Sequence, residues 1–155
     1  MSGDKPWVNH LSISPAGRAL IESFEGLKLE AYQDCRGIWT IGYGHTGCVK
    51  EGDTCTQGQA DAWQASDAAF VANVLNSQLA VEVSQNQFDA LGSLAYNIGV
   101  GHFLSSTLFS LLQKGDSAGA AGQFEKWSYA NGQWIEGLNR RRLAEKQMFL
   151  GVTNA

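Results

Sequence analysis

An apolar stripe at helical spacing runs through residues 20–24, shortly after Ser14 and Pro15. Serine followed by proline is typical of a helix N-cap and first helical position, because serine accepts from free backbone N–H groups and proline lacks one. Gly26 is typical of a helix end. The pattern therefore predicts a helix whose last residue is Glu25.

The pattern then changes to an alternation of apolar and polar residues. It alternates over residues 27–32 and again over 38–44, and turn-forming residues occupy 34–37 between the two runs. Alternation places the apolar side chains on one face of a half-exposed strand. The sequence therefore predicts a short antiparallel hairpin directly after the first helix.

Two long helices are predicted after a glycine-containing loop over residues 46–54. Each begins with a capping box, formed by Thr56 with Gln59 and by Ser84 with Gln87. We expect the second helix to be the buried centre of the fold, ending in the segment 99–101. The apolar residues at helical spacing are Trp63, Phe70, Val71, Val74 and Leu75 in the first helix, and Phe88, Leu91, Leu94, Ala95 and Ile98 in the second.

Shorter helical patterns cover residues 107–113, 117–129 and 138–150. Together with the hairpin they indicate an α+β fold, in which a small antiparallel β-hairpin lobe and a larger helical lobe enclose a substrate cleft. With 155 residues, of which 44% are hydrophobic, the chain has enough apolar side chains for one core. We expect residues 1–10 to be an N-terminal extension and 11–155 to be a single domain with two lobes.

Charge and hydropathy argue against two classes of protein, those that bind nucleic acid and those that associate with membranes. The formal net charge is -4, and residues 140–142 are the one dense basic run, which argues against broad binding to nucleic acid or anionic membranes. Residues 1–10 lack the apolar stretch of a signal peptide, and no other apolar run is long enough for a transmembrane helix. We therefore expect synthesis in the cytoplasm and no stable membrane association.

The cysteines Cys35, Cys48 and Cys55 show neither a CxxC pair nor a nearby pair of histidines, so we expect no metal site. Six residues separate Cys48 from Cys55. A disulfide between these two would close the loop if their Cα atoms come within about 7 Å. Three reduced thiols are the alternative.

Glu25, Asp34 and Thr40 are the candidates for chemistry. Hydrolysis of a glycosidic bond needs a proton donor and, across the sugar, a group that activates water or stabilises the cation. Glu25 is expected at a helix C-terminus, where the helix dipole disfavours negative charge, and this suits a proton donor. Asp34 at the turn and the Thr40 hydroxyl on the returning strand can hold a water between them. The alternative for each carboxylate is a solvated turn residue.

The residues that carry these groups also form a recognisable signature. Residues 25–34 (EGLKLEAYQD) and 37–46 (GIWTIGYGHT) resemble the active-site signature of the phage-type lysozymes, the endolysins of glycoside hydrolase family 24. The signature is Glu, eight residues, Asp, five residues and Thr. The resemblance covers most of the chain, and its other matches are residues 85–91, 96–99, 105–108 and 137–145.

The resemblance implies an endolysin that hydrolyses the β-1,4 bond between N-acetylmuramic acid and N-acetylglucosamine in peptidoglycan, and so causes host cell lysis without a cofactor. By position, Glu25 matches the general acid, and Asp34 and Thr40 match the pair that positions the water, which implies inversion. We expect a monomer that is made in the host cytoplasm. A holin-type pore would then release it to the cell wall in the periplasm.

Three further residues are expected to support the site or bind substrate. By resemblance, Arg141 holds the acid, with a solvated residue at a helix start as the alternative. Asn97 likewise faces the substrate from the helical lobe, with a buried helix-end amide as the alternative. For His45 we expect a structural hydrogen bond rather than acid–base catalysis. The aromatic residues that could face sugar rings are Trp39, Tyr43 and Trp134.

Two other function classes are compatible with a lysozyme-like fold. One is a binding module that keeps the fold without the chemistry. The other is a lytic transglycosylase, which needs the acid but not the pair that manages water. The complete set of Glu25, Asp34 and Thr40 favours hydrolysis over both.

Overall fold

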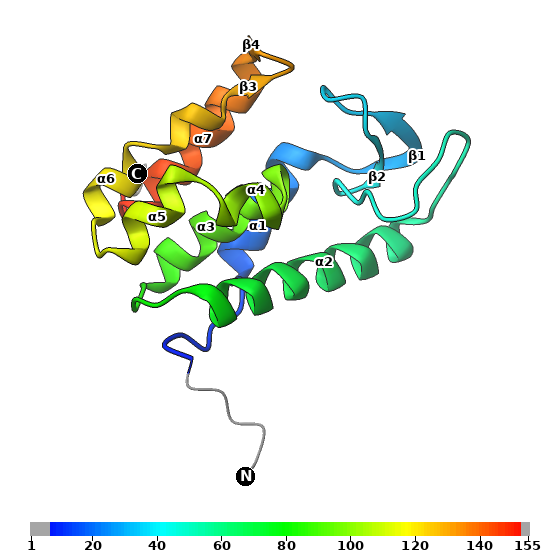
Figure 1. Ribbon diagram of the computed structural model, residues 1–155. Helices are drawn as coiled ribbons and strands as arrows, with labels where there is room; N and C mark the ends of the chain where they lie inside the picture. Colours follow the sequence, from blue (N-terminus) through cyan, green and yellow to red (C-terminus); the bar gives the residue numbers. More distant parts are fainter. Residues whose placement is uncertain (1–6, 153–155) are drawn as a thin grey trace.

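The chain folds into a large helical lobe and a small β lobe, shown in Figure 1. The computed structural model describes residues 7–152. The β lobe contains β1 (Lys28–Gln33) and β2 (Trp39–Gly42). Helix α1 (Pro15–Glu25) leads into this lobe and α2 (Gln57–Gln78) leads out of it. The arrangement confirms the predicted α+β fold.

Helix α1 begins and ends where the sequence predicts. The Ser14 side chain accepts from the backbone N–H of Gly17, and Pro15 occupies the first helical position. Gly26 caps the other end with a φ of 67°, a left-handed conformation that glycine adopts without a steric penalty. The chain therefore leaves the helix directly after Glu25, at the junction of the two lobes.

Strands β1 and β2 form a two-stranded antiparallel sheet in which Tyr32 pairs with Thr40. The turn between them is closed at Asp34, whose backbone N–H donates to the carbonyl of Ile38 at 2.9 Å. Because Tyr32 precedes Asp34 by two residues, this register brings the Thr40 hydroxyl and the Asp34 carboxylate to the same end of the hairpin.

Helix α3 (Gln85–Ile98) is the centre of the helical lobe, as predicted. Both predicted capping boxes are present, at the starts of α2 and α3. Every residue from Phe88 to Ala95 is buried, because α1, α2 and α7 (Glu136–Phe149) pack around α3. Functional groups on α1 and α7 are therefore positioned against one rigid element.

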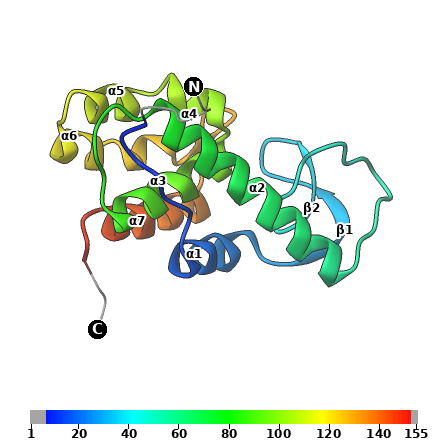
Figure 2. The same cartoon turned by 90° about the horizontal axis from the view of Figure 1, so that it is seen from below.

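Helix α2 runs from the helical lobe to the β lobe, as Figure 2 shows. Its buried face includes Val71, Ala72 and Leu75. Phe70, which we expected on that face, is 58% exposed, because its position lies about 100° around the helix from Val71. Within residues 7–152 no helix, α2 included, is long and apolar enough to span a membrane.

The region between α3 and α7 differs from the prediction. A five-residue helix, α4 (Val100–Leu104), follows α3 at once, and α5 (Thr107–Gln113) then lies where expected. The single helix expected over 117–129 is wrong. That stretch is divided into α6 (Ser117–Ala121) and the 3-10 helix η1 (Phe124–Trp127), since glycines at positions 119 and 122 weaken a continuous helix.

A second hairpin precedes α7, formed by β3 (Tyr129–Ala130) and β4 (Gln133–Trp134). Its turn consists of Asn131, with a φ of 53°, and Gly132, with a φ of 77°. Two positive φ angles in an Asn-Gly pair are typical of tight hairpin turns. The sequence interpretation treated this pair only as a break between helices, and so missed the hairpin.

Part of the expected N-terminal extension packs against the helical lobe. Asn9 is 4% exposed, and its side chain donates to the carbonyl of Val81 at 2.8 Å and accepts from the backbone N–H of Val83 at 3.0 Å. The boundary expected at residue 11 therefore does not separate residues 7–10 from this lobe. Residues 1–6 of the expected extension lie outside the described residues.

The cysteines are unpaired, so the suggested disulfide between Cys48 and Cys55 is not formed. The backbone N–H of Cys55 donates to Leu29 of β1, and its Sγ lies 3.9 Å from the Lys28 carbonyl. Cys48 is exposed and has a φ of 58°. Cys55 is thus held against β1, and Cys48 belongs to the exposed loop.

Candidate active site

A cleft with a volume of about 830 Å³ opens between the two lobes. This volume lies within the usual range of ligand sites. Five of the six residues proposed for the site from sequence line the cleft, and His45 does not. The five are Glu25, Asp34, Thr40, Asn97 and Arg141.

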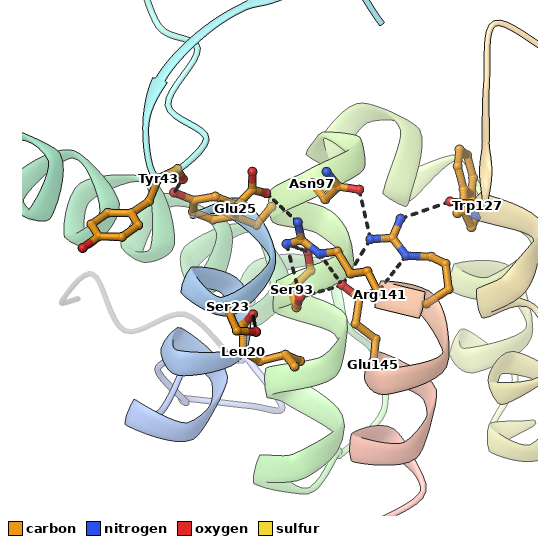
Figure 3. Close-up of polar contacts among 11 residues, drawn as sticks. Leu20, Ser23, Glu25, Tyr43, Ser93, Asn97, Trp127, Arg141 and Glu145 are labelled. Atoms are coloured by element: carbon orange, nitrogen blue, oxygen red, sulfur yellow. Dashed lines mark hydrogen bonds and ion pairs between the residues drawn. The ribbon is translucent and has the colours of Figure 1, made fainter. Parts of the chain in front are cut away.

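Glu25 lies at the wall of the cleft with 13% of its side chain exposed. Its Oε2 accepts from Arg141 Nη1 at 2.5 Å (Figure 3). The other carboxylate oxygen lies against Gly44, where an added Cβ would come within 2.5 Å of Oε1. Gly44 also has a φ of 80°, so glycine is required here for both space and conformation. These two contacts fix the orientation of the carboxylate.

Arg141 is 3% exposed, and its guanidinium donates hydrogen bonds to three residues. Besides Glu25 it donates to Glu145 Oε2 at 3.1 Å and to the carbonyl of Ser93 at 3.2 Å. Burial acts to lower the pKa of Arg141, but the carboxylates of Glu25 and Glu145 outweigh burial and raise this pKa. The guanidinium is therefore a permanent, rigidly placed cation beside Glu25.

Arg142 and Glu145 extend this ion pair into the core. Both side chains are fully buried, and Arg142 Nε lies 2.8 Å from Glu145 Oε1. Burial lowers the pKa of Arg142, and Glu145 opposes that effect. Glu25, Arg141, Glu145 and Arg142 thus form a row of alternating charges, whose two positive and two negative groups balance. Figure 3 labels the first three of them.

Asn97 lies at the far end of this row. Its side-chain carbonyl oxygen accepts from Arg142 Nη2 at 2.9 Å, and the residue lines the cleft near the end of α3. Because the oxygen is engaged by Arg142, the amide N–H groups are the part of Asn97 left for a ligand. Asn97 therefore combines the two alternatives, because its side chain is hydrogen-bonded at the end of α3 and also lines the cleft.

Asp34 and Thr40 face the cleft from the β lobe. Asp34 Oδ1 accepts two backbone N–H bonds, from Arg36 at 2.8 Å and from Ile38 at 2.9 Å. Thr40 is 3% exposed, and its hydroxyl donates to the Ile38 carbonyl at 2.8 Å. The Asp34 carboxylate retains its second oxygen as an acceptor, and the Thr40 oxygen retains its lone pairs.

His45 is held outside the cleft. Its Nδ1 lies 2.8 Å from Asp67 Oδ2, and its ring stacks on Trp63 with centroids 4.6 Å apart. These contacts join the end of the hairpin signature to α2. The contact with Asp67 is a hydrogen bond of the kind expected for His45, whose structural role stays a prediction.

The aromatic residues of the cleft differ from those expected. Trp39, Tyr43 and Trp134 do not line it, and Tyr43 is buried with its carbonyl accepting from the Tyr96 hydroxyl at 2.7 Å. Tyr32 does line it. Burial, with the nearby charges of Glu25 and Asp34, raises the pKa of Tyr32, so its hydroxyl remains a hydrogen-bond donor.

Sequence reasoning missed the residues that support Arg141 behind Glu25. Glu145 belonged to the matched C-terminal segment but was given no role, and Ser93, whose hydroxyl donates to Glu145 Oε2 at 2.5 Å, was not singled out. The available signal was the spacing of Arg141, Arg142 and Glu145, which places both arginines within one helical turn of the glutamate. No local pattern indicates Ser93.

Comparison with known proteins gives a consistent result over most of the chain. A family model described as phage lysozyme matches residues 22–145. An endolysin from Acyrthosiphon pisum secondary endosymbiont phage 1 is 48% identical over 143 residues, which cover 90% of this chain and 98% of that protein. The match includes both lobes and every residue that lines the cleft.

Solved structures share the fold. The muramidase domain of SpmX from Asticaccaulis excentricus superposes with a TM-score of 0.81 at 39% identity, covering 91% of this chain and 99% of that one. An endolysin from Escherichia coli O157:H7 phage FAHEc1 gives a TM-score of 0.79 at 35% identity, covering 95% and 99%. Both similarities extend over the two lobes and the cleft between them.

Proposed function

Because the chain belongs to the phage lysozyme family and hydrolyses peptidoglycan, we propose that it cuts the β-1,4 bond between N-acetylmuramic acid and N-acetylglucosamine, with Glu25 as the general acid. One observation carries this proposal. A carboxylate fixed by a buried arginine faces, across one cleft, a second carboxylate and a hydroxyl with free acceptor positions. This is the arrangement that glycoside hydrolysis requires.

Glu25 is suited to give a proton to the leaving oxygen. Arg141 engages Oε2, so Oε1 is the oxygen from which the proton would pass. Arg141 also pairs with Glu145, so its positive charge is not directed at Glu25 alone. A sugar in the cleft excludes water from around the carboxylate, which removes a competing partner for the proton.

Asp34 and Thr40 are suited to hold the attacking water. Asp34 Oδ2 and the Thr40 oxygen can each accept one hydrogen from the same water, because their other hydrogen bonds go to the backbone. A water held by both hydrogens directs a lone pair away from them, toward the anomeric carbon. Asp34 then takes up the proton that this water loses. Attack from the face opposite Glu25 inverts the anomeric configuration.

Asn97 completes the proposed site from the helical lobe. Since Arg142 holds its carbonyl oxygen, the amide can donate to the acetamido carbonyl of a bound sugar. The buried charges between Glu25 and Asn97 keep the acid and this donor in one fixed geometry. In this proposal, the buried charges of Arg141, Glu145 and Arg142 serve to hold the groups that line the cleft in place.

The bond cut and the fate of the water are tested together by digesting purified glycan strands in ¹⁸O-water. The proposal predicts reducing ends at N-acetylmuramic acid that carry one ¹⁸O atom, detected by mass spectrometry. Anhydro ends without label would indicate transglycosylation. Label at N-acetylglucosamine would indicate cleavage of the other bond, and either result contradicts the proposal.

We also propose that the protein acts as a monomer and reaches the wall through a holin-type pore. The support is the similarity to phage endolysins along the chain. Expression in a host without a pore-forming protein should leave cells intact until the membrane is permeabilised. Rapid lysis of untreated cells would contradict this route, and a dimer by light scattering would contradict the monomer.

A further inference from the structure

The β3–β4 hairpin carries two large aromatic side chains that the fold leaves open. Tyr129 is 53% exposed and Trp134 is 50% exposed. The two residues pair directly across the antiparallel strands, so their side chains lie on the same face of the hairpin. Ala130, the alternate residue on β3, is 6% exposed. The aromatic face is therefore exposed, whereas on the opposite face Ala130 is buried and its partner Gln133 is exposed.

This hairpin lies at the rim of the cleft. At its turn, the Asn131 side chain donates to the carbonyl of Cys35 at 3.3 Å, and Cys35 lines the cleft. Immediately after Trp134, Ile135 also lines the cleft. Figure 1 shows the hairpin at the start of α7, on the side toward the β lobe. The hairpin thus adjoins the proposed substrate site, with Tyr129 and Trp134 just outside the residues that line the cleft.

The hairpin does not depend on its aromatic pair for its position. A two-stranded hairpin of this size is marginal alone. Here the hairpin is anchored at Ser128, which is fully buried. The Ser128 carbonyl accepts from the Ile135 N–H at 2.8 Å, and the Ser128 hydroxyl donates to Asn139 Oδ1 at 3.1 Å. Because these contacts hold the strands, the exposed aromatic surface is available to a ligand.

We propose that Tyr129 and Trp134 form a platform that binds the glycan strand where it leaves the cleft. This inference rests on the proposed function. Peptidoglycan is a polymer, so sugars on either side of the cut bond must continue over the rim of the cleft. The apolar C–H faces of N-acetylated sugars pack on aromatic rings, and the Trp134 N–H and Tyr129 O–H can donate to sugar oxygens. The platform would increase affinity for long strands.

A kinetic comparison tests the platform through its dependence on strand length. In Trp134→Ala and Tyr129→Ala, we expect KM for long glycan strands to rise about three- to tenfold with kcat unchanged. KM for the shortest cleavable fragments should not change, and Trp134→Phe should restore most of the affinity. Phe70→Ala is the matched control, since Phe70 is 58% exposed and does not line the cleft.

Three kinetic results would contradict the proposed platform. An unchanged KM on long strands in the folded double variant contradicts it, and so does an equal rise in Phe70→Ala. A fall in kcat without a change in KM contradicts it as well. The thermal midpoint of each variant, compared with that of the unmodified protein, shows whether the hairpin has remained folded.

Direct binding separates this inference from the proposed function and identifies the occupant. In a Glu25→Gln background, Trp134→Ala should weaken binding to glycan strands about three- to tenfold, whether or not stem peptides are attached. A loss seen only with strands that carry stem peptides would mean that the platform binds peptide, which overturns the proposal. Full activity of Glu25→Gln itself would contradict the proposed function, while the binding comparison would still stand.

Discussion

Arg141 Nη1 lies 2.5 Å from Glu25 Oε2, although the two residues are 116 positions apart in the chain. The pair joins the last residue of α1 to the C-terminal helix α7, and Ser93 of α3 bonds to the same arginine. The orientation of the Glu25 carboxylate is therefore set by the assembled helical lobe. Activity should be lost as soon as this lobe loosens.

Glu25→Gln should remove nearly all activity, with a decrease in kcat of about two to four orders of magnitude. The amide has almost the same shape but cannot give the proton. Circular dichroism should show an unchanged fold. Glu22→Gln, on the same helix but outside the cleft lining, should keep near-normal turnover. Near-normal turnover of Glu25→Gln would exclude Glu25 as the acid.

Gly44→Ala should damage the site through its effect on Glu25. The new methyl group would lie 2.5 Å from Oε1, and the residue would have to keep a φ of 80°. We expect a cost of about 1–3 kcal/mol, a thermal midpoint lower by several degrees and at least about tenfold lower kcat. Gly52→Ala has a comparable φ of 90° but no neighbouring atoms within 4 Å, so it should destabilise without the same loss of kcat. Equal kcat losses in both variants would argue against the contact with Glu25.

Thr40→Val tests the water site on the β lobe. Valine keeps the branched shape but cannot accept from water, so kcat should fall by about 10- to 100-fold while KM changes little. Thr40→Ser, which keeps the hydroxyl, should recover much of the loss. If valine and serine behave alike, the hydroxyl has no role in holding the water.

Arg142→Met tests the buried row of charges. Glu145 would lose one of its two cationic partners in a fully buried position, which should cost about 3–5 kcal/mol and lower the thermal midpoint by about 10 °C. The Asn97 side chain would also lose its hydrogen bond from Arg142, so KM should rise. Arg140→Met, at an exposed position, should leave the midpoint nearly unchanged. An unchanged midpoint in Arg142→Met would show that the pair contributes nothing to stability.

Local signals in the sequence predicted the elements that position Glu25. Ser14 with Pro15 and Gly26 defined α1, and two capping boxes defined α2 and α3, because each signal satisfies backbone groups within a few residues. The spacing of Glu25, Asp34 and Thr40, together with the resemblance to the phage-type lysozymes, predicted that all three line one cleft, and they do.

Features that depend on long-range packing were not predictable in this way. The contacts of Arg142 with Glu145 and Asn97 form only when α3 and α7 pack together. Tyr32 rather than Tyr43 lines the cleft. The alternation of apolar and polar residues could not predict which tyrosine faces the cleft, because the pairing of β1 with β2 is irregular between Lys28 and Tyr32. The short β3–β4 hairpin was missed because two-residue strands have no detectable period.

The most direct test of the account is the anomeric configuration of the first product. An NMR time course on a defined glycan fragment follows the newly formed reducing end of N-acetylmuramic acid before mutarotation. In the proposed mechanism the water held by Asp34 and Thr40 attacks from the face opposite Glu25, so the α-anomer should appear first. If the β-anomer appears first, the configuration is retained, and Asp34 and Thr40 do not hold the attacking water in the way proposed.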